Sequence, residues 1–261
     1  MDLQLVGKTV FVSGSTQGIG FAIAATCLAE GARVIVNGRS DERVAEALGR
    51  LRTLVPSGDV SGIRADFSNS AQVESLLDVI GEVDVLVNNV GIFELADFAE
   101  TSDAEWLRYF EVNTLSGVRL SRRLLGPMLE RGWGRIIFVG TESAVDVPGN
   151  MLPYGATKAA SLALSNGLAK LTRGTGVTVN TVLGGPTYSD GVARTVEQIA
   201  AAQSITVEQM KSALVRDSSL VQRFIQPGEI AQLVAFLASP LSSAINGAAV
   251  RAEGGVLPTV L

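Results

Sequence analysis

Near its N-terminus the chain reads Thr9-Val10-Phe11-Val12-Ser13-Gly14-Ser15-Thr16-Gln17-Gly18-Ile19-Gly20. The apolar run at its start is typical of a buried strand, and a helical pattern follows from Ile19. The glycines between them allow a tight turn and a close approach to a phosphate, to which a helix N-terminus offers free N–H groups. Their spacing differs from the Gly-x-Gly-x-x-Gly dinucleotide fingerprint, but the place between strand and helix is the same. We therefore predict a nucleotide phosphate site made of Gly14, Ser15, Thr16, Gln17, Gly18, Ile19 and Gly20.

Strand and helix patterns alternate from this turn to the C-terminus. The alternation predicts a parallel sheet with helices on both faces, a three-layer, doubly wound α/β fold of the Rossmann type. A closed eight-stranded barrel alternates in the same way, but its phosphate site follows its last two strands rather than its first. A chain of 261 residues is compatible with one domain. The expected strands are 9–13, 34–36, 62–65, 83–87, 136–139, 177–182 and 248–250, and the expected helices are 19–30, 41–54, 71–80, 104–131, 154–172 and 229–238.

The composition excludes several classes of protein. The formal net charge is −5 and no Lys/Arg-rich run is present, so nucleic acid is not an expected partner. The sequence has no histidine, which rules out Ser-His-Asp and Cys-His catalysis and argues against a zinc site, so we expect no metal. The single cysteine, Cys27, lies in an apolar helical pattern and fits a reducing cytoplasm. We expect a cytoplasmic protein without a signal sequence or a membrane span.

One region interrupts the alternation. From 184 to 226 the sequence shows no strand pattern and only two helical patterns, at 190–202 and 207–218. An insertion of this length beyond the carboxyl end of a strand commonly covers a ligand site, so we expect a substrate lid. A surface elaboration without a role in binding is the alternative.

Two residues farther along indicate acid–base chemistry. Tyr154 and Lys158 are four positions apart and therefore share one face of the predicted helix 154–172. A free phenol titrates near pH ~10, and a neighbouring cation lowers the pKa of the phenol because it favours the phenolate. Such a pair can exchange a proton with a carbonyl or alcohol oxygen. The same spacing also arises by chance where an exposed lysine lies beside a half-buried tyrosine.

The end of the second predicted strand indicates which nucleotide is bound. An acidic residue about 20 positions beyond the glycine turn would bind the 2′-hydroxyl of an adenosine ribose, but Asn37-Gly38-Arg39-Ser40 stands there. The guanidinium of Arg39 can pair with a 2′-phosphate, which favours NADP(H) without excluding NAD(H). Alternatively, Arg39 only begins the next helix on a solvated surface, which is our interpretation of Arg33 and Arg43.

Six motifs together resemble the short-chain dehydrogenase/reductase family over nearly the whole chain, from Lys8 to Gly255. One such motif alone is weak evidence, whereas six in this order on these elements are specific. They are the glycine turn, Asn88-Asn89-Val90-Gly91 after the fourth strand, Asn113 in the next long helix, Thr141-Glu142-Ser143 after the fifth strand, Tyr154-x-x-x-Lys158, and Gly185-Pro186-Thr187 after the sixth strand.

The resemblance implies catalytic roles for three of these residues. Tyr154 would be the general acid when a ketone is reduced and the base in the reverse direction. Lys158 would lower the pKa of Tyr154 and bind the nicotinamide ribose. Asn113 would hold a water molecule in a proton relay, or it is only the residue at which the long helix kinks.

The resemblance also implies contacts with the cofactor. Asp66, followed by Phe67, would bind the adenine amino group, unless Asp66 only caps the helix that starts near Ser70. An Asn-Asn-x-Gly turn can be purely structural. The remaining residues that would contact the cofactor are Asn88, Asn89, Gly91, Pro186, Thr187, Tyr154 and Lys158.

The chain departs from the family pattern at three positions. The substrate-orienting serine of the family is replaced by Thr141, with Ser143 two residues on. Threonine keeps the hydroxyl but has fewer rotamers, so we expect Thr141 to orient the substrate, with Ser143 as the alternative. Val90 replaces a small alanine, and Gly184 stands where proline is common and would loosen the hinge of the lid.

The expected activity is the NADPH-dependent reduction of a ketone or 3-oxoacyl-type carbonyl to a secondary alcohol, or the reverse, on a small-molecule substrate. A nucleotide-sensing or regulatory protein that kept this fold, and a partner-binding subunit that binds no nucleotide, are the alternatives.

An apolar wall of Phe93, Leu95, Tyr188 and Met210 would face the substrate, or these residues are ordinary packing. Small residues on helix 154–172 (Ala156, Ala160, Ala163 and Gly167, followed by Leu171) allow close helix packing. That packing lies within the monomer or, as the resemblance implies, in a homodimer or homotetramer.

Overall fold

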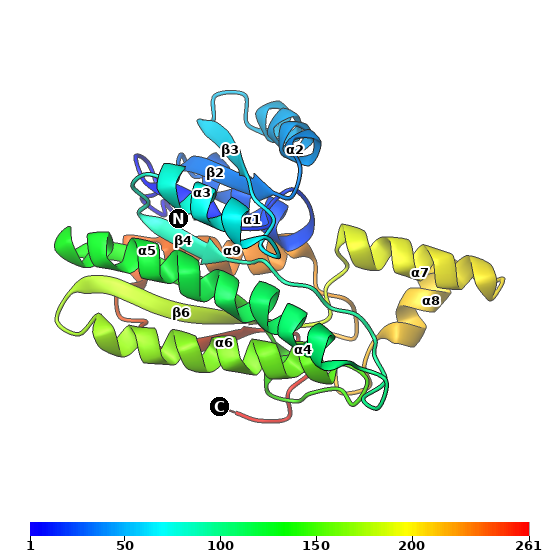
Figure 1. Cartoon of the computed structure of the whole chain (residues 1–261). Helices are drawn as coiled ribbons and strands as arrows, with labels where there is room; N and C mark the ends of the chain where they lie inside the picture. Colours follow the sequence, from blue (N-terminus) through cyan, green and yellow to red (C-terminus); the bar gives the residue numbers. More distant parts are fainter. Residues whose placement is uncertain (261) are drawn as a thin grey trace.

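The computed structural model describes residues 1–260, and in them a single parallel sheet of seven strands forms the centre of the molecule (Figure 1). The strand order is β3-β2-β1-β4-β5-β6-β7. This arrangement confirms the predicted doubly wound α/β fold. The strands are β1 (Thr9–Val12), β2 (Arg33–Gly38), β3 (Val60–Arg64), β4 (Val85–Asn88), β5 (Trp133–Thr141), β6 (Gly176–Gly184) and β7 (Ala249–Ala252).

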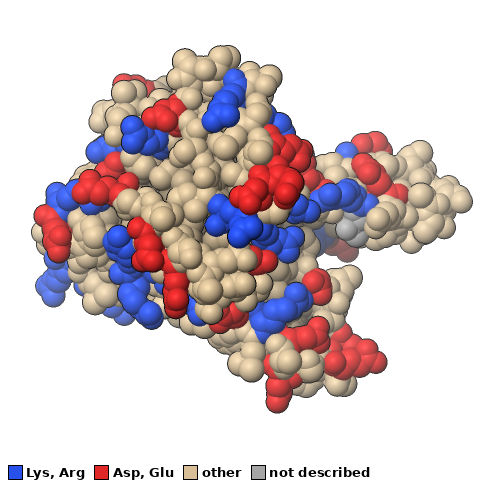
Figure 2. All heavy atoms as spheres, turned by 45° about the horizontal axis from the view of Figure 1, so that its top comes forward, with Lys and Arg blue, Asp and Glu red and all other residues tan. Residues whose placement is uncertain are grey.

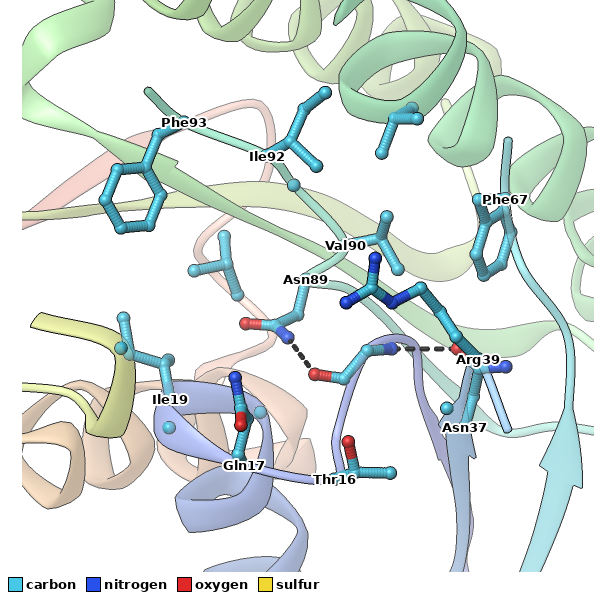
Figure 3. Close-up of a pocket in the computed structure, with 18 of the residues that line it drawn as sticks. Thr16, Gln17, Ile19, Asn37, Arg39, Phe67, Asn89, Val90, Ile92 and Phe93 are labelled. Atoms are coloured by element: carbon cyan, nitrogen blue, oxygen red, sulfur yellow. Dashed lines mark hydrogen bonds between the residues drawn. The ribbon is translucent and has the colours of Figure 1, made fainter. Parts of the chain in front are cut away.

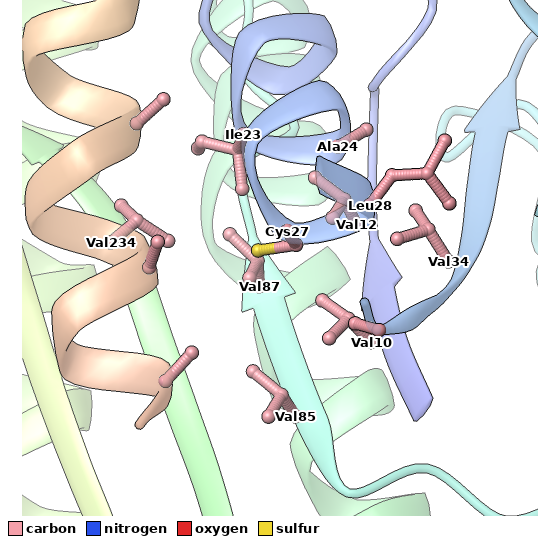
Figure 4. Packing of buried hydrophobic residues seen from close by; sticks show 14 of the residues in the cluster. Val10, Val12, Ile23, Ala24, Cys27, Leu28, Val34, Val85, Val87 and Val234 are labelled. Carbon is pink, nitrogen blue, oxygen red and sulfur yellow. The ribbon is translucent and has the colours of Figure 1, made fainter. Parts of the chain in front are cut away.

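Helices cover both faces of the sheet because successive strand residues point to opposite sides. Val10 and Val12 belong to the apolar cluster on one face, and Phe11 belongs to the cluster on the other. Figure 4 shows the first cluster, in which Ile23 and Cys27 of one helix meet strand valines. One face carries α1 (Gly18–Ala29), α2 (Asp41–Leu54) and α9 (Pro227–Ala238), and the other carries α3 (Ser70–Val79), α5 (Ser116–Glu130) and α6 (Leu152–Leu171).

The strand order places a crevice beside the glycine turn. From β1 the chain proceeds to β2 and β3 on one side, and it then crosses to β4 on the other side of β1. Loops that leave the carboxyl ends of β1 and β4 therefore run in opposite directions, which opens the ligand site of a doubly wound sheet.

The long helix expected at 104–131 is interrupted. The structure has α4 (Asp103–Phe110), a π-helical turn (Glu111–Leu115) and then α5. The turn accommodates one extra residue, and such turns in α-helices are frequently found at functional sites. Asn113 lies in this turn, so the helix is irregular at the residue for which a kink was the alternative to a water relay.

The segment 184–226 projects from the body of the molecule as α7 (Asp190–Ala202) and α8 (Val207–Leu214) (Figure 1). Val196, Ala200 and Met210 give these helices a small apolar core of their own. Helix α8 ends at Leu214 rather than at 218 because the backbone is extended at Val215. A bridge between Thr187 and Ile225 brings the two ends of the segment together.

Charged residues form local pairs on the surface. Arg33 pairs with Asp59, and Arg64 pairs with Asp41. Figure 2 shows acidic and basic side chains interspersed over one face of the molecule. Of the described helices, none is both long and apolar enough to cross a membrane.

Candidate active site

A cavity of about 420 Å³ lies in the crevice between β1 and β4 (Figure 3). Its walls come from the carboxyl ends of β1, β2, β4 and β5, the start of α1 and the start of α7. The cavity therefore brings together residues that lie far apart in the sequence. The predicted site residues that line it are Gly14, Thr16, Gln17, Gly18, Ile19, Gly20, Arg39, Asp66, Phe67, Asn89, Gly91, Tyr154 and Lys158.

Two asparagines hold the glycine turn. The side-chain amide of Asn89 donates to the carbonyl oxygens of Ser13 and Gly14, at 2.9 Å each, and the amide nitrogen of Gly14 donates to Oδ1 of Asn37 at 3.0 Å (Figure 3). Gly14 has a φ of 60°, which lies in the left-handed region that favours glycine. A Cβ on Gly20 would lie 2.5 Å from both Nδ2 of Asn89 and the carbonyl oxygen of Gly14. The turn therefore requires glycine at these positions, and it needs Asn37, which the sequence did not identify.

Four residues predicted to contact the cofactor do not line the cavity, and Ser15 and Asn88 are two of them. Ser15 is fully buried, where its hydroxyl donates to the carbonyl oxygen of Val12 and accepts from the amide of Asn37. Asn88 donates to Oγ of Ser121 on α5 at 3.4 Å, and its Oδ1 is buried with no partner. Neighbouring strand residues face opposite sides of the sheet, so Asn88 points away from the side on which Asn89 meets the turn. In this structure both residues support the fold and neither lines the cavity.

The far end of the cavity is polar and charged. Arg39 extends toward the cavity (Figure 3), and Asp66 accepts from the amide and the hydroxyl of Ser68 at 2.9 and 2.7 Å. The N-cap of α3 is Asn69, which excludes the alternative that Asp66 caps this helix. Arg43 also lines the cavity, contrary to its interpretation as a surface residue only. A second cation therefore stands beside Arg39.

Tyr154 and Lys158 line the other end of the cavity. Lys158 is 7% exposed, its Nζ donates to the carbonyl oxygen of Val139 at 3.0 Å, and burial lowers its pKa to about 8. A Cβ on Gly91 would lie 3.2 Å from this Nζ, so glycine leaves room for the lysine. Burial raises the pKa of Tyr154, whereas a hydrogen bond with Thr141 acts in the opposite direction. The pKa of Tyr154 is therefore raised rather than lowered in this structure, because desolvation of the phenol dominates, and a stabilising effect of Lys158 on the phenolate stays a prediction.

Asn113 uses its side chain to join three parts of the chain. Its Oδ1 accepts from the amide of Ile92 at 2.7 Å, and its Nδ2 donates to the carbonyl oxygen of Ile92 at 3.1 Å and to Oγ1 of Thr157 at 3.0 Å. The backbone carbonyl of Asn113 accepts from Ser161 on α6. Asn113 thus fixes the loop after β4 against α6, and a role in a water relay stays a prediction.

A buried carboxylate joins the two hydroxyls that are candidates for orienting the substrate. Thr141, which is the last residue of β5 rather than a residue beyond it, donates to Oε2 of Glu142 at 2.6 Å. Ser143 donates through Oγ to Oε1 of Glu142 at 3.2 Å. Arg216, from the 184–226 segment, approaches the same Oε1 at 3.2 Å. No sequence pattern singles out Glu142 or Arg216, because their pairing exists only in the folded chain.

The 184–226 segment contacts the glycine turn through a residue that the sequence did not single out, whereas the predicted contact of Pro186 and Thr187 with the nicotinamide stays a prediction. Pro186 and Thr187 do not line the cavity, and the Thr187 hydroxyl donates to the carbonyl oxygen of Gly185 at 2.8 Å. Instead Asp190, at the start of α7, accepts from the amide of Gly18 at 2.6 Å. A carboxylate thus accepts a hydrogen bond from an N–H group at the start of α1, where a phosphate group would bind.

Only one of the four apolar residues expected to face the substrate lines the cavity. Phe93 packs against Tyr154, with ring centroids 6.0 Å apart. Leu95 is exposed, and Tyr188 and Met210 belong to the small core of α7 and α8. The proposed wall is therefore not one surface.

The model of the short chain dehydrogenase family matches residues 8–200. The chain belongs to the short-chain dehydrogenase family. It is 44% identical to an uncharacterised oxidoreductase of Bacillus subtilis, YvaG, over the whole of both chains. It is 31% identical to the 3-oxoacyl-[acyl-carrier-protein] reductase FabG of Aquifex aeolicus, over 98% of this chain and 100% of that protein.

Solved structures agree with this assignment. The structure of L-sorbose reductase from Gluconobacter frateurii, complexed with NADPH and L-sorbose, superimposes with a TM-score of 0.93 over 100% of both chains, at 29% identity. The short-chain dehydrogenase described here is accordingly an NAD(P)-dependent oxidoreductase.

The cavity of this short-chain dehydrogenase fits a nicotinamide dinucleotide. The turn at its centre excludes side chains, since a Cβ on Gly20 would collide with backbone, and Gly18, with a φ of 59°, also adopts a left-handed conformation. The amide of Gly18 donates to the carboxylate of Asp190, so an anionic group is already accommodated at this turn. The pyrophosphate would lie on this turn, the adenosine end near Arg39 and Asp66, and the nicotinamide end near Tyr154 and Lys158.

Proposed function

We propose that this short-chain dehydrogenase reduces a ketone or 3-oxoacyl-type carbonyl to a secondary alcohol with NADPH, and that Tyr154 is the general acid. The observation that carries the proposal is that Tyr154 and Lys158 line the same cavity as the glycine turn and Arg39. The proposal is supported by relatives whose names describe an NADPH-bound sorbose reductase and a 3-oxoacyl reductase.

The state of Tyr154 suits a reduction. When bound, NADPH would supply a hydride to the carbonyl carbon. Because burial raises the pKa of Tyr154, the phenol is protonated at neutral pH and can give its proton to the carbonyl oxygen as that oxygen gains charge. The O–H bond of the phenol breaks and the new O–H bond forms on the alcohol. Lys158, whose pKa of about 8 leaves it charged at neutral pH, would stabilise the phenolate that remains.

The preference for NADPH rests on Arg39 and Arg43. Both line the cavity at the end of β2, where an acidic residue would favour NAD(H). The two guanidiniums would hold the 2′-phosphate by charge-assisted hydrogen bonds.

We further propose that the chain forms a homodimer or homotetramer through α6, and that the 184–226 segment covers the substrate. Ala163, Gly167 and Leu171 are exposed in the monomer, so the face of small residues is not covered within the chain. Sedimentation at several concentrations tests the first proposal, and a strict monomer would contradict it. A location in the cytoplasm stays a prediction.

The test of the reaction is Tyr154→Phe. The variant should lose roughly 10²–10⁴ in turnover of any ketone that the wild type reduces, because it lacks the proton donor. Its affinity for NADPH should stay close to that of the wild type. NADPH consumption with a panel of ketones gives the first measurement, and quenching of tryptophan fluorescence gives the second. Near-normal turnover by the variant would refute the assignment, and NADPH binding without reduction of any ketone would favour a nucleotide-sensing protein.

A further inference from the structure

The two ends of the 184–226 segment are attached to the body of the protein in different ways. Its first helix, α7, meets the glycine turn through two hydrogen bonds that are exposed to solvent. The returning stretch, residues 215–225, contacts the body through a side chain that is almost completely buried, that of Glu142. Exposed polar contacts break at low cost, whereas loss of one partner from a buried ion pair is costly. The two ends should therefore differ in how easily they move.

Glu142 depends on the segment for the balance of its charge. The residue is 3% exposed, and its carboxylate accepts hydrogen bonds from the hydroxyls of Thr141 and Ser143. These hydroxyls are neutral. Of the residues that the structure describes, only Arg216 brings a cation within ion-pair distance, with 3.2 Å between its Nη2 and Oε1 of Glu142. Because a buried charge is costly unless it is paired, Glu142 opposes separation of the returning stretch from the body.

Glu142 lies beside the catalytic end of the cavity. It directly follows β5, in a short turn that packs on α6, the helix that carries Tyr154 in its first turn. A Cβ on Gly155 would lie 2.8 Å from the carbonyl oxygen of Ser143, so the two turns are in close contact. A stretch of chain that is held by Glu142 is therefore held next to the turn of Tyr154.

Backbone hydrogen bonds reinforce this attachment. The amides of Leu220 and Val221 donate to the carbonyl oxygen of Gly254, beyond β7, at 2.9 and 3.2 Å, and the amide of Ile225 donates to the carbonyl oxygen of Pro186 at 2.9 Å. A Cβ on Gly254 would lie 2.6 Å from the side chain of Val221. The returning stretch thus lies closely on the body, whereas α7 and α8 project from it (Figure 1).

We propose that Arg216 and Glu142 are positioning residues that hold the returning stretch over the substrate end of the site, so that α7 can yield to the coenzyme while the substrate end stays covered. This role rests on the proposed function, in which the segment covers the substrate of Tyr154. One ion pair then separates the part of the segment that moves from the part that stays in place.

The first measurement is hydrogen–deuterium exchange of backbone amides, which requires no substrate. In Arg216→Gln the amides of Leu220, Val221 and Ile225 should exchange roughly 10-fold faster than in the wild type, because the unpaired carboxylate favours separation. Glu142→Gln should accelerate the same amides, because Arg216 then lacks its partner. Unchanged exchange in β6 would show that each variant is folded.

The double variant Arg216→Gln/Glu142→Gln tests whether the two residues act through each other. Its exchange rates should be close to those of either single variant, because the second substitution has no interaction left to remove. Arg216→Lys keeps the charge and should restore most of the protection. Effects that multiply in the double variant, or equal losses in Arg216→Lys and Arg216→Gln, would overturn the proposed ion pair.

The second measurement is steady-state kinetics with a ketone that the wild type reduces. In Arg216→Gln the KM for the ketone should rise roughly 10-fold, while kcat and the affinity for NADPH stay within about twofold, because Tyr154 and the glycine turn are unchanged. Arg33→Gln is the matched control. It also removes an arginine from a pair with a carboxylate, that of Asp59, but at the amino end of β2, and it should change neither exchange in the returning stretch nor KM.

The two measurements separate this proposal from the proposed function. Unchanged exchange of the returning stretch in both single variants would overturn the proposal, and so would faster exchange with an unchanged KM. If exchange responds as expected while Tyr154→Phe keeps its turnover, the proposed function fails and the attachment of the segment by Arg216 and Glu142 stands.

Discussion

The glycine turn and the 184–226 segment meet at the same cavity but are held in place differently. The turn is fixed by buried backbone and side-chain bonds to Asn37 and Asn89, between two strands of the central sheet. The segment has its own small core and touches the turn and the catalytic end of the cavity mainly through polar side chains. Those contacts are Asp190 with Gly18, Arg194 with Gln17, and Arg216 with Glu142.

The difference indicates which part of the site exists before the coenzyme arrives. Buried, mutually satisfied hydrogen bonds make a rigid turn, whereas the exposed contacts of Asp190 and Arg194 contribute little and break at low cost. The turn is therefore preorganised, and we expect the segment to be displaced more easily than the turn. Substitutions in the turn should change binding strongly, and substitutions at the contacts of the segment should change it weakly.

The largest effect is expected for Gly20→Val. Its side chain would enter space already occupied by Asn89 and the carbonyl oxygen of Gly14. Overpacking of this kind costs ~1–3 kcal/mol or more, so the affinity for NADPH should fall roughly 100-fold. A fluorescence titration measures the affinity for NADPH. The control is Gly49→Val, on an exposed face of α2 where nothing lies within 4 Å, and it should leave the affinity unchanged. Equal losses in both variants would contradict a preorganised turn.

The next-largest effect on coenzyme affinity is expected for Arg39→Gln. Loss of a charged hydrogen bond to phosphate costs about 1.5–3 kcal/mol, or roughly 10–100-fold in the affinity for NADPH. The affinity for NADH should not change, because it has no 2′-phosphate. Arg33→Gln, which alters an ion pair at the amino end of the same strand, β2, is the matched control. If Arg39→Gln weakens both coenzymes equally, Arg39 does not select NADPH.

Lys158→Met tests what it costs the folded protein to bury a charge in the fixed part of the site. In the folded protein the pKa of Lys158 is about 8, below its ordinary value of 10.5. Below pH 8 the folded state therefore bears the cost of a buried charge, and between pH 8 and 10.5 the stability rises with pH because the unfolded chain binds more protons. The variant should gain about 1–3 kcal/mol in the free energy of unfolding near pH ~7. That gain should shrink toward pH ~10 in urea unfolding experiments. A gain that does not depend on pH would show that burial of the charge is not its cause.

The smallest effect is expected for Asp190→Asn. The amide oxygen can still accept from Gly18, but the negative charge near the expected pyrophosphate is removed. An interaction of this size at a helix N-terminus is worth about 0.3–1 kcal/mol, so the affinity for NADPH should rise about 2–5-fold at low salt and less at high salt. Glu197→Gln, an exposed carboxylate on the same helix, should have no such effect. A lower affinity would mean that Asp190 supports the coenzyme site.

The sequence predicted the elements that depend on local patterns. The turn at Gly14–Gly20 and the pair Tyr154 and Lys158 are visible because glycines and a four-residue spacing have a direct structural meaning. The sequence did not show that Asn88 faces α5. In a fully buried strand both faces are apolar, so an apolar run does not reveal which residues point to which face of the sheet. The sequence motif also contained Glu142 but gave no sign of its burial, which depends on Arg216 in a different part of the fold.

The pKa of the Tyr154 hydroxyl was predicted in the wrong direction for a related reason. Sequence spacing reveals that a cation lies nearby, but it does not reveal desolvation, which depends on everything packed around the phenol. The sequence did not indicate the contact of Asp190 with the turn, because the path of an irregular chain beyond β6 has no periodic signal.

The single cysteine gives this enzyme a practical property. Cys27 is sealed between α1 and the sheet, and burial raises the pKa of its thiol to about 12, so it should resist alkylating reagents at neutral pH. A reporter thiol introduced on the outer side of α7 would then be the one site that takes up a fluorescent label. Without further engineering, the fluorescence of that label could follow the motion of α7 as the coenzyme binds and dissociates.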